Sequence, residues 1–221
     1  MKYQRKFNTE TDVQILVKPN VVLVADTGKV LYNVEPPKGA YIQHIDGSLY
    51  TTDQWTAMGF AKEDANGVAV IGDNTKFVIA KVTLDTMAWS SDTSNAVEGV
   101  VLTNNLATAK TDYAGAANTA LIAADDTSGA ALACANFIFP NGAKGYLPAL
   151  GEWNEAYVYK EDINEALILI SGTTFVSKHY WSSTQYAADE VWKLRWSDGN
   201  ISYDLKLRTG IYVRPFTSLN I

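Results

Sequence analysis

The segment 179–215, HYWSSTQYAADEVWKLRWSDGNISYDLKLRTGIYVRP, alternates apolar and polar residues near the end of a 221-residue chain. Side chains of a β-strand point alternately to its two faces, so a period of two predicts strands with unlike faces. Trp192, Leu194 and Trp196 then share one face. SDGN at 197–200 has the composition of a tight turn. The segment therefore predicts a β-hairpin.

The two strands of this hairpin divide their residues between a mainly apolar and a mainly polar face. The first strand places Val191, Lys193 and Arg195 opposite its tryptophans. The return strand places Ile201, Tyr203, Leu205 and Leu207 on one side, and Ser202, Asp204, Lys206 and Arg208 on the other. We expect one face to pack on helices and the polar, charged face to lie in solvent.

Short apolar runs interrupted by turn residues predict further hairpins upstream. Residues 41–50 turn at Asp46-Gly47, and residues 67–82 turn at GDNT. Residues 13–34 are typical of two or three short strands with a DTGK turn. So small a hairpin is marginal alone in water, and it needs a partner from this chain or another.

Other stretches favour helices. In TTDQWTAMG, Thr52 or Asp53 can cap a helix that Gly59 ends. Helical spacing recurs at Ala131, Cys134, Ala135 and Ile138, and in ALGEWNEAYVY at 149–159. In EDINEALILIS, Asp162 and Glu165 resemble a capping box that begins a helix.

Composition narrows the class of protein. The chain is 47% hydrophobic and 19% charged, with a formal net charge of −6, as in folded soluble proteins. It has no basic stripe, so we expect no nucleic-acid partner. Its apolar runs are too short for a membrane span, and no apolar region follows the basic N-terminus, so we expect no signal peptide and synthesis in the cytoplasm.

Catalytic and cofactor motifs are missing from the sequence, which contains no HExxH, CxxC, GxSxG, P-loop or GxGxxG pattern. The two histidines, His44 and His179, lie far apart in the sequence, and the one cysteine, Cys134, excludes an internal disulfide. Cys134 lies among small apolar residues and is expected to be buried. We predict no catalytic residue, no metal ligand and no cofactor.

Several stretches occur in a characteristic order: DYAGAANT (112–119), GYLPALGEW (145–153), INEAL (163–167), YWSSTQY (180–186), a VW…W..G strand pair and YVRP (212–215). Together they resemble the C-type-lectin-like domains of phage and bacterial ligand-binding proteins, including the variable proteins of diversity-generating retroelements. The resemblance implies an α+β fold in which two helices pack on a twisted, mainly antiparallel sheet. The predicted domains are an N-terminal β module for anchoring or oligomerisation (1–37), a linker hairpin with a short helix (38–64) and the C-type-lectin-like domain (65–221).

The resemblance also implies a division of the C-terminal segment into framework and contact residues. Trp181, Trp192, Gly199 and the Val213-Arg214-Pro215 end match framework positions. The candidate ligand-binding residues are Tyr186, Ala187, Ala188, Asp189, Glu190, Lys193, Arg195, Ser197, Asp198, Asn200, Tyr203, Asp204 and Arg208.

The N-terminal stretch GAYIQHIDGSLYTTDQW (39–55) is similar to leader modules of structural proteins in tailed phages. This likeness implies a virion protein, a head fibre, tail fibre or capsid decoration. It would dock on capsid or tail proteins through its N-terminal module. Its C-terminal face would bind a bacterial surface glycan or protein, and a homotrimer would bury the N-terminal strands. The alternatives are a bacterial surface or secreted adhesin with the same fold and a purely structural virion protein.

Two activities of related folds are expected to be absent. Formylglycine-generating enzymes share the fold family, but they depend on a pair of cysteines and this chain has only Cys134. The C-terminal segment also has no Glu-Pro-Asn-like or Trp-Asn-Asp-like cluster for a lectin-type calcium site. We therefore predict a protein that is not an enzyme.

Overall fold

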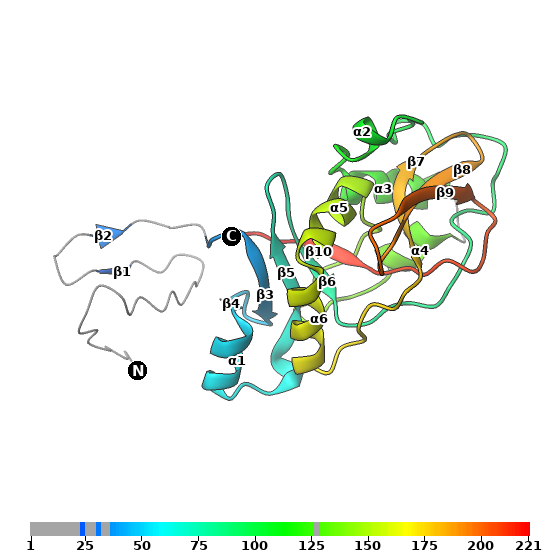
Figure 1. Ribbon diagram of the computed structural model, residues 1–221. Coiled ribbons are helices and arrows are strands. Elements are labelled where there is room, and N and C mark those ends of the chain that lie inside the picture. Colours follow the sequence, from blue (N-terminus) through cyan, green and yellow to red (C-terminus); the bar gives the residue numbers. More distant parts are fainter. Residues whose placement is uncertain (1–22, 25–29, 32–35, 126–128) are drawn as a thin grey trace.

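The computed structural model describes residues 23–24, 30–31, 36–125 and 129–221. Strands β1 (Leu23–Val24) and β2 (Val30–Leu31) pair antiparallel as a two-stranded sheet of their own (Figure 1). This pairing agrees with the hairpin predicted there. Most of the predicted N-terminal module lies outside the described residues.

A five-stranded antiparallel sheet has the order β10-β6-β5-β3-β4 (Figure 1). Its strands are β3 (Gly39–His44), β4 (Leu49–Tyr50), β5 (Ala65–Ile71), β6 (Lys76–Ala80) and β10 (Phe216–Ser218). The hairpins predicted in 41–50 and 67–82 are confirmed as β3–β4 and β5–β6. The C-terminal strand β10 joins the free edge of β6, and local periodicity had not indicated that contact.

A second antiparallel sheet contains the C-terminal segment, in the order β7-β8-β9. Its strands are β7 (His179–Gln185), β8 (Glu190–Arg195) and β9 (Ile201–Leu205). The predicted hairpin across SDGN is confirmed as β8–β9. Strand β9 is an edge strand, in which Ile201, Ser202 and Asp204 are half-buried and Tyr203 and Leu205 are exposed.

The helices are α1 (Thr52–Met58), α2 (Leu106–Ala109), α3 (Gly115–Asp125), α4 (Ala130–Ala135), α5 (Leu150–Val158) and α6 (Lys160–Leu169), with a 3-10 turn η1 at Lys62–Asp64. Thr51, one residue before the predicted caps, accepts the N–H of Gln54 and begins α1, and Gly59 ends it in the left-handed conformation. The predicted capping box of α6 is wrong, because that helix already begins at Lys160, directly after α5.

Helices α5 and α6 connect the two main sheets: α5 packs on β7 and β8, and α6 packs on β3 and β5 (Figure 1). Trp153 of α5 lies at the centre of the largest apolar cluster, which also contains Tyr180, Trp196 and Phe216. Its indole N–H donates to the carbonyl of Trp181 at 2.9 Å. One continuous core thus lies beneath both sheets.

Both faces of the five-stranded sheet are buried. In β5, Val68 and Val70 belong to the largest cluster, whereas Ala69 and Ile71 face a separate cluster with Phe139. A strand covered on both sides is mainly apolar, and β5 is buried at every position, with Asn66 as its one polar side chain.

The three-stranded sheet also has both faces covered. Leu194 packs in the largest cluster, and Trp181 and Val191 pack on the opposite face in a cluster with Trp89 and Val213. The prediction of one solvated face is therefore wrong for β8. Segments outside the hairpin cover the second face.

The segment 38–64, predicted as a linker, contributes β3 to the interior of the five-stranded sheet. Ile42, Tyr50 and Trp55 are buried in the largest cluster. The division of the chain into domains stays a prediction, but this segment shares its core with the C-terminal part. The fold class is α+β with antiparallel sheets and several helices. None of the helices within the described ranges is long and apolar enough to cross a membrane.

Candidate functional site

A buried polar network fixes the base of the three-stranded sheet. Asp112, 4% exposed, accepts hydrogen bonds from the Thr184 hydroxyl at 2.8 Å and the Asn118 amide at 3.0 Å. Asn118 also donates to the Ser183 hydroxyl, and Thr184 accepts the N–H of Leu150. Buried polar groups linked in this way hold a fixed geometry. The stretches DYAGAANT, GYLPALGEW and YWSSTQY therefore meet in one place.

Hydrogen bonds from tryptophan indoles join residues 87–103 to this sheet. Trp89 donates to the carbonyl of Ser182 at 2.9 Å, Trp181 to that of Met87 at 3.0 Å, and Trp192 to that of Thr103 at 2.9 Å. Each bond crosses at least 89 residues of sequence, between the C-terminal segment and residues 87–103. Trp181 and Trp192 are thus buried side chains that hold these segments against the sheet.

Lys193 is the candidate ligand-binding residue that the structure places in the interior. Its side chain is 10% exposed and its ammonium group lies 2.6 Å from Asp204 Oδ2. The prediction that it faces solvent is wrong, because Trp181 and Val191 on the same face pack against the cluster around Trp89. Lys206, also assigned to the solvated side, is buried and donates to the carbonyl of Asn95 at 2.7 Å.

The orientation predicted for the return strand is likewise wrong. Tyr203, Leu205 and Leu207 were expected to share a face with the core, but they are 44%, 53% and 55% exposed. Strand β9 lies at the sheet edge, beyond the helices that cover β7 and β8.

The remaining candidates lie at the surface in two groups. Arg195 and Asp198 form an ion pair at the β8–β9 turn, and this pair lowers the pKa of Asp198 to about 2. The second group surrounds the β7–β8 turn and the end of β9. The exposed candidates are Ala188, Asp189, Ser197, Asp198, Asn200, Tyr203 and Arg208, and the half-buried ones are Tyr186, Ala187, Glu190, Arg195 and Asp204.

Three aromatic side chains meet at the second group, and we call Tyr186, Trp192 and Tyr203 the aromatic surface. The rings of Tyr186 and Tyr203 stack with centroids 3.7 Å apart and planes 10° apart. The Trp192 ring stands nearly perpendicular to both, at 4.9 Å and 6.0 Å. The hydrogen bond that the Tyr186 hydroxyl donates to Tyr203 stabilises its protonated form and raises the pKa of Tyr186. The aromatic surface is therefore a pre-formed arrangement.

Carboxylates border the aromatic surface on one side. Glu190 and Leu205 are cross-strand partners, as are Trp192 and Tyr203, so all four side chains belong to one face of the hairpin. Burial raises the pKa of Glu190, and the charges of Asp189 and Asp204 raise it further.

Exposed leucines that sequence reasoning missed lie beside the aromatic surface. Leu102 is 51% exposed and forms a bridge with Gln185, next to Tyr186. Leu106, at the start of α2, is 40% exposed. The bond from Trp192 to Thr103 places this segment against the aromatic surface. Nothing in the local pattern of residues 102–106 signals the contact between Thr103 and Trp192, which are 89 residues apart in the sequence.

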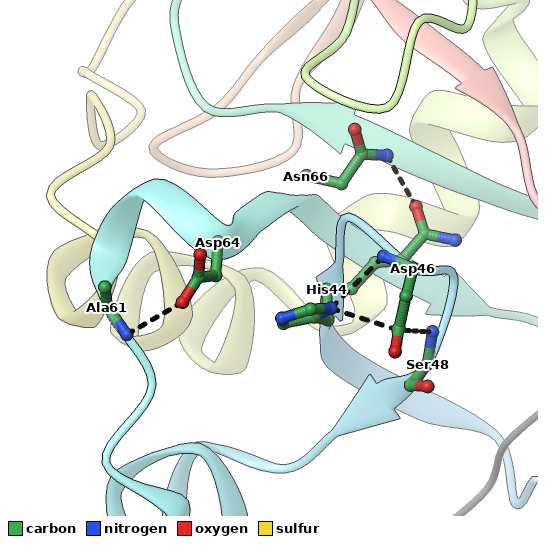
Figure 2. A network of polar contacts seen from close by, with 7 residues as sticks. His44, Asp46, Ser48, Ala61, Asp64 and Asn66 are labelled. Atoms are coloured by element: carbon green, nitrogen blue, oxygen red, sulfur yellow. Dashed lines mark hydrogen bonds and ion pairs between the residues drawn. The ribbon is translucent and has the colours of Figure 1, made fainter.

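A second polar cluster lies at the β3–β4 turn and has a structural role (Figure 2). His44 Nδ1 lies 3.0 Å from Asp46 Oδ1, which also accepts the N–H of Ser48 at 2.9 Å. Nearby, the Asn66 amide donates to Gln43 at 2.6 Å. These hydrogen bonds pair polar groups of the turn and of the bulge at His44. Among the described residues no group of three or more His, Cys, Asp or Glu side chains has an arrangement that could hold a metal ion.

Cys134 is buried as expected, and burial raises the pKa of its thiol well above the ordinary value. A thiol in that state is a poor nucleophile. Its position in the cluster with Trp89 and Trp181 is that of a small hydrophobic residue.

Comparison with known proteins gives one informative likeness. No family model matches the chain, and no curated protein matches it. Among solved structures, the chain is similar to a fimbrial protein from Bacteroides ovatus, with 15% sequence identity and a TM-score of 0.59. The match covers 83% of this chain but 49% of that protein, so the chain spans about half its length. At this identity the likeness shows a shared fold and leaves the phage-specific and lectin-specific expectations unsupported.

Proposed function

We propose that the chain is an adhesive module of a bacterial surface appendage, and that it makes contact through the aromatic surface of Tyr186, Trp192 and Tyr203. The observation that carries this proposal is an ordered group of aromatic side chains at an exposed sheet edge, with Tyr203 44% exposed. Exposed aromatic clusters on folded proteins mark sites of interaction.

The support beneath the aromatic surface suits a binding role. Trp192 is only 5% exposed and is held by the carbonyl of Thr103, so one member of the group is fixed in the core. Binding loops and edges on a rigid scaffold lose little conformational entropy when a ligand docks. The contact residues can therefore be ordered before the partner arrives.

The fold of a fimbrial protein supports a place on the cell surface. It also supports a role that is not enzymatic, together with the sequence's lack of catalytic motifs. Of the alternatives raised by the sequence, the bacterial surface adhesin is the one this likeness favours.

The C-type-lectin-like assignment stays a proposal of finer detail. It is supported by the network that joins Asp112, Asn118, Ser183 and Thr184, because these residues come from the stretches that suggested the resemblance. A virion location, docking on capsid or tail proteins and a homotrimer rest on the resemblance alone. The virion proposal would be contradicted if mass spectrometry of purified phage particles did not detect the protein.

The proposed function is tested by adhesion. Beads coated with the full chain are applied to layers of bacterial and epithelial cells, and retention is compared with beads carrying Tyr203→Ala. We expect the variant to lose most of the retention at an unchanged melting temperature, because Tyr203 is a surface residue. The matched control is Ile168→Ala, which removes a 67% exposed side chain from α6 and should retain adhesion. Equal retention of wild type and Tyr203→Ala would sink the proposal.

A further inference from the structure

Resting on the proposed function, we infer that the aromatic surface receives an arginine side chain of a partner protein, with its guanidinium stacked on Tyr203 and paired with the carboxylate of Glu190. Nothing in the fold likeness specifies such a ligand.

The ring geometry leaves one face of a tyrosine available. Tyr186 and Tyr203 are nearly parallel at 3.7 Å, so each ring covers one face of the other. Tyr203 is nevertheless 44% exposed, whereas Tyr186 is half-buried beside Trp192. The exposed area of Tyr203 therefore includes ring that its neighbour does not cover. An aromatic face carries partial negative charge and attracts a cation placed over it.

The strand register puts a carboxylate on the same face as this ring. Trp192 pairs with Tyr203, and two residues along each strand Glu190 pairs with Leu205. Residues two apart on a strand share a face, so Glu190 points to the side of Tyr203. Its charge also acts on the hydroxyl of Tyr186, whose pKa it helps to raise.

The charges around Glu190 do not cancel. Asp204 is neutralised by Lys193 at 2.6 Å and also feels Arg208. Within the described part of the chain, no cation or hydrogen-bond donor contacts the side-chain carboxylates of Asp189 and Glu190. The border of the aromatic surface is thus electronegative, and a complementary partner brings positive charge.

Arginine fits this combination better than other charged or neutral groups. Its planar guanidinium stacks on aromatic rings and pairs with carboxylates through fixed donors, and it sheds water more readily than an ammonium group. An acidic ligand would meet Asp189 and Glu190, and a purely apolar ligand would leave these carboxylates desolvated and unpaired. Arginine is also enriched at protein interfaces, together with tyrosine and tryptophan.

The test uses a pair of peptides that differ in charge but hardly in shape. The full chain, labelled with ¹⁵N, is titrated with acetyl-Gly-Arg-Gly-amide and with the same peptide carrying neutral citrulline, above neutral pH so that Glu190 is ionised. The indole N–H signal of Trp192 reports on the aromatic surface, and Trp192→Phe assigns it. We expect the arginine peptide to shift this signal, to bind at least about fivefold more tightly than the citrulline peptide, and to weaken as salt is added.

Single-residue variants measure the contributions of the Tyr203 ring and the Glu190 carboxylate to binding separately. Tyr203→Ala leaves every charge in place and should weaken arginine binding by about fivefold, whereas Tyr203→Phe keeps the ring and should retain it. Glu190→Gln should weaken binding and reduce its salt dependence. Glu63→Gln changes the net charge equally at an exposed position elsewhere and should have no effect. Unchanged binding in both Tyr203→Ala and Glu190→Gln overturns the inference.

Other outcomes are equally decisive. Equal binding of the arginine and citrulline peptides overturns the inference. The inference is also overturned if the neutral methyl glycosides of glucose, galactose or mannose shift the Trp192 signal and the arginine peptide does not. Loss of cell adhesion in Tyr203→Ala without any arginine binding overturns the inference and leaves the proposed function standing. Adhesion unaffected by Tyr203→Ala overturns both.

Discussion

Glu152 is a buried acid that links the stability of the protein to pH. It is 3% exposed, and it accepts the hydroxyl of Tyr146 at 2.9 Å and the N–H of Ala149 at 2.7 Å. Burial raises its pKa from 4.5 to about 8, and the charges of Asp112 and Glu155 add to the shift. The folded protein therefore holds a proton that the unfolded chain releases.

The sign of the pH effect follows from this raised pKa. The contribution of Glu152 to stability is complete below about pH 4.5 and is lost as the pH rises towards 8. The wild-type protein should lose on the order of 4 kcal/mol of stability between these pH values, and we predict that the neutral isostere Glu152→Gln abolishes this loss. Urea unfolding at several pH values measures it. A slope as steep in Glu152→Gln as in the wild type would contradict the assignment.

Individual residues also show where a sequence pattern stops being informative. The period of two correctly grouped Trp192 with Leu194 and Tyr203 with Leu205, because it depends on strand geometry alone. It did not tell which group would be covered. Lys193 is buried because segments around Trp89 and Val213 cover that face, and a hairpin pattern contains no information about them.

At the scale of elements, the β8–β9 turn determines where the hairpin lies on α5. Gly199 has φ +69°, a conformation that favours glycine, and a Cβ there would lie 2.5 Å from the ring of Tyr157. Its N–H donates to the carbonyl of Arg195. The turn residue and the helix surface are therefore fitted to each other.

A substitution at this turn tests the fit. We predict that Gly199→Ala lowers the free energy of unfolding by about 2 kcal/mol, because the backbone is strained and Tyr157 must move. Gly210→Ala is the control, since a Cβ there has no heavy atom within 4 Å, and it should change stability by less than about 0.5 kcal/mol. Equal unfolding midpoints for both variants in guanidinium chloride would be inconsistent with the close contact.

Elements formed by neighbouring residues were predictable, and their boundaries were less so. The hairpins β3–β4, β5–β6 and β8–β9 follow from turn chemistry between apolar runs. The start of α6 was missed because no side chain caps it and it continues from α5 at Tyr159. Tertiary packing of Ile163 and Leu167 places this helix without a local start signal.

At the scale of the whole molecule, long-range pairings position the candidate site. Strand β10 joins β6, and the segment around Thr103 receives the indole of Trp192. Contacts between residues so distant in sequence leave no trace in local periodicity. The sequence therefore indicated Tyr186 and Tyr203 as candidates, but not their stacking or the exposed Leu102 and Leu106 beside them.

At this scale the proposed function requires that one end of the protein contacts the partner and that the rest of the fold supports that end. Exposed apolar side chains also occur elsewhere, such as Val158 on α5 and Ile168 on α6. Scattered residues of this kind are ordinary on folded proteins. The aromatic surface differs because its side chains are stacked, partly fixed in the core and bordered by carboxylates.

The most direct test of this claim is hydroxyl-radical footprinting of the full chain, free and bound to the cells that retain it. We predict that binding protects Tyr186, Tyr203 and Leu205 from oxidation and leaves Val158 and Ile168 as reactive as in the free protein. Protection of Val158 and Ile168 with unchanged oxidation of Tyr203 would contradict it.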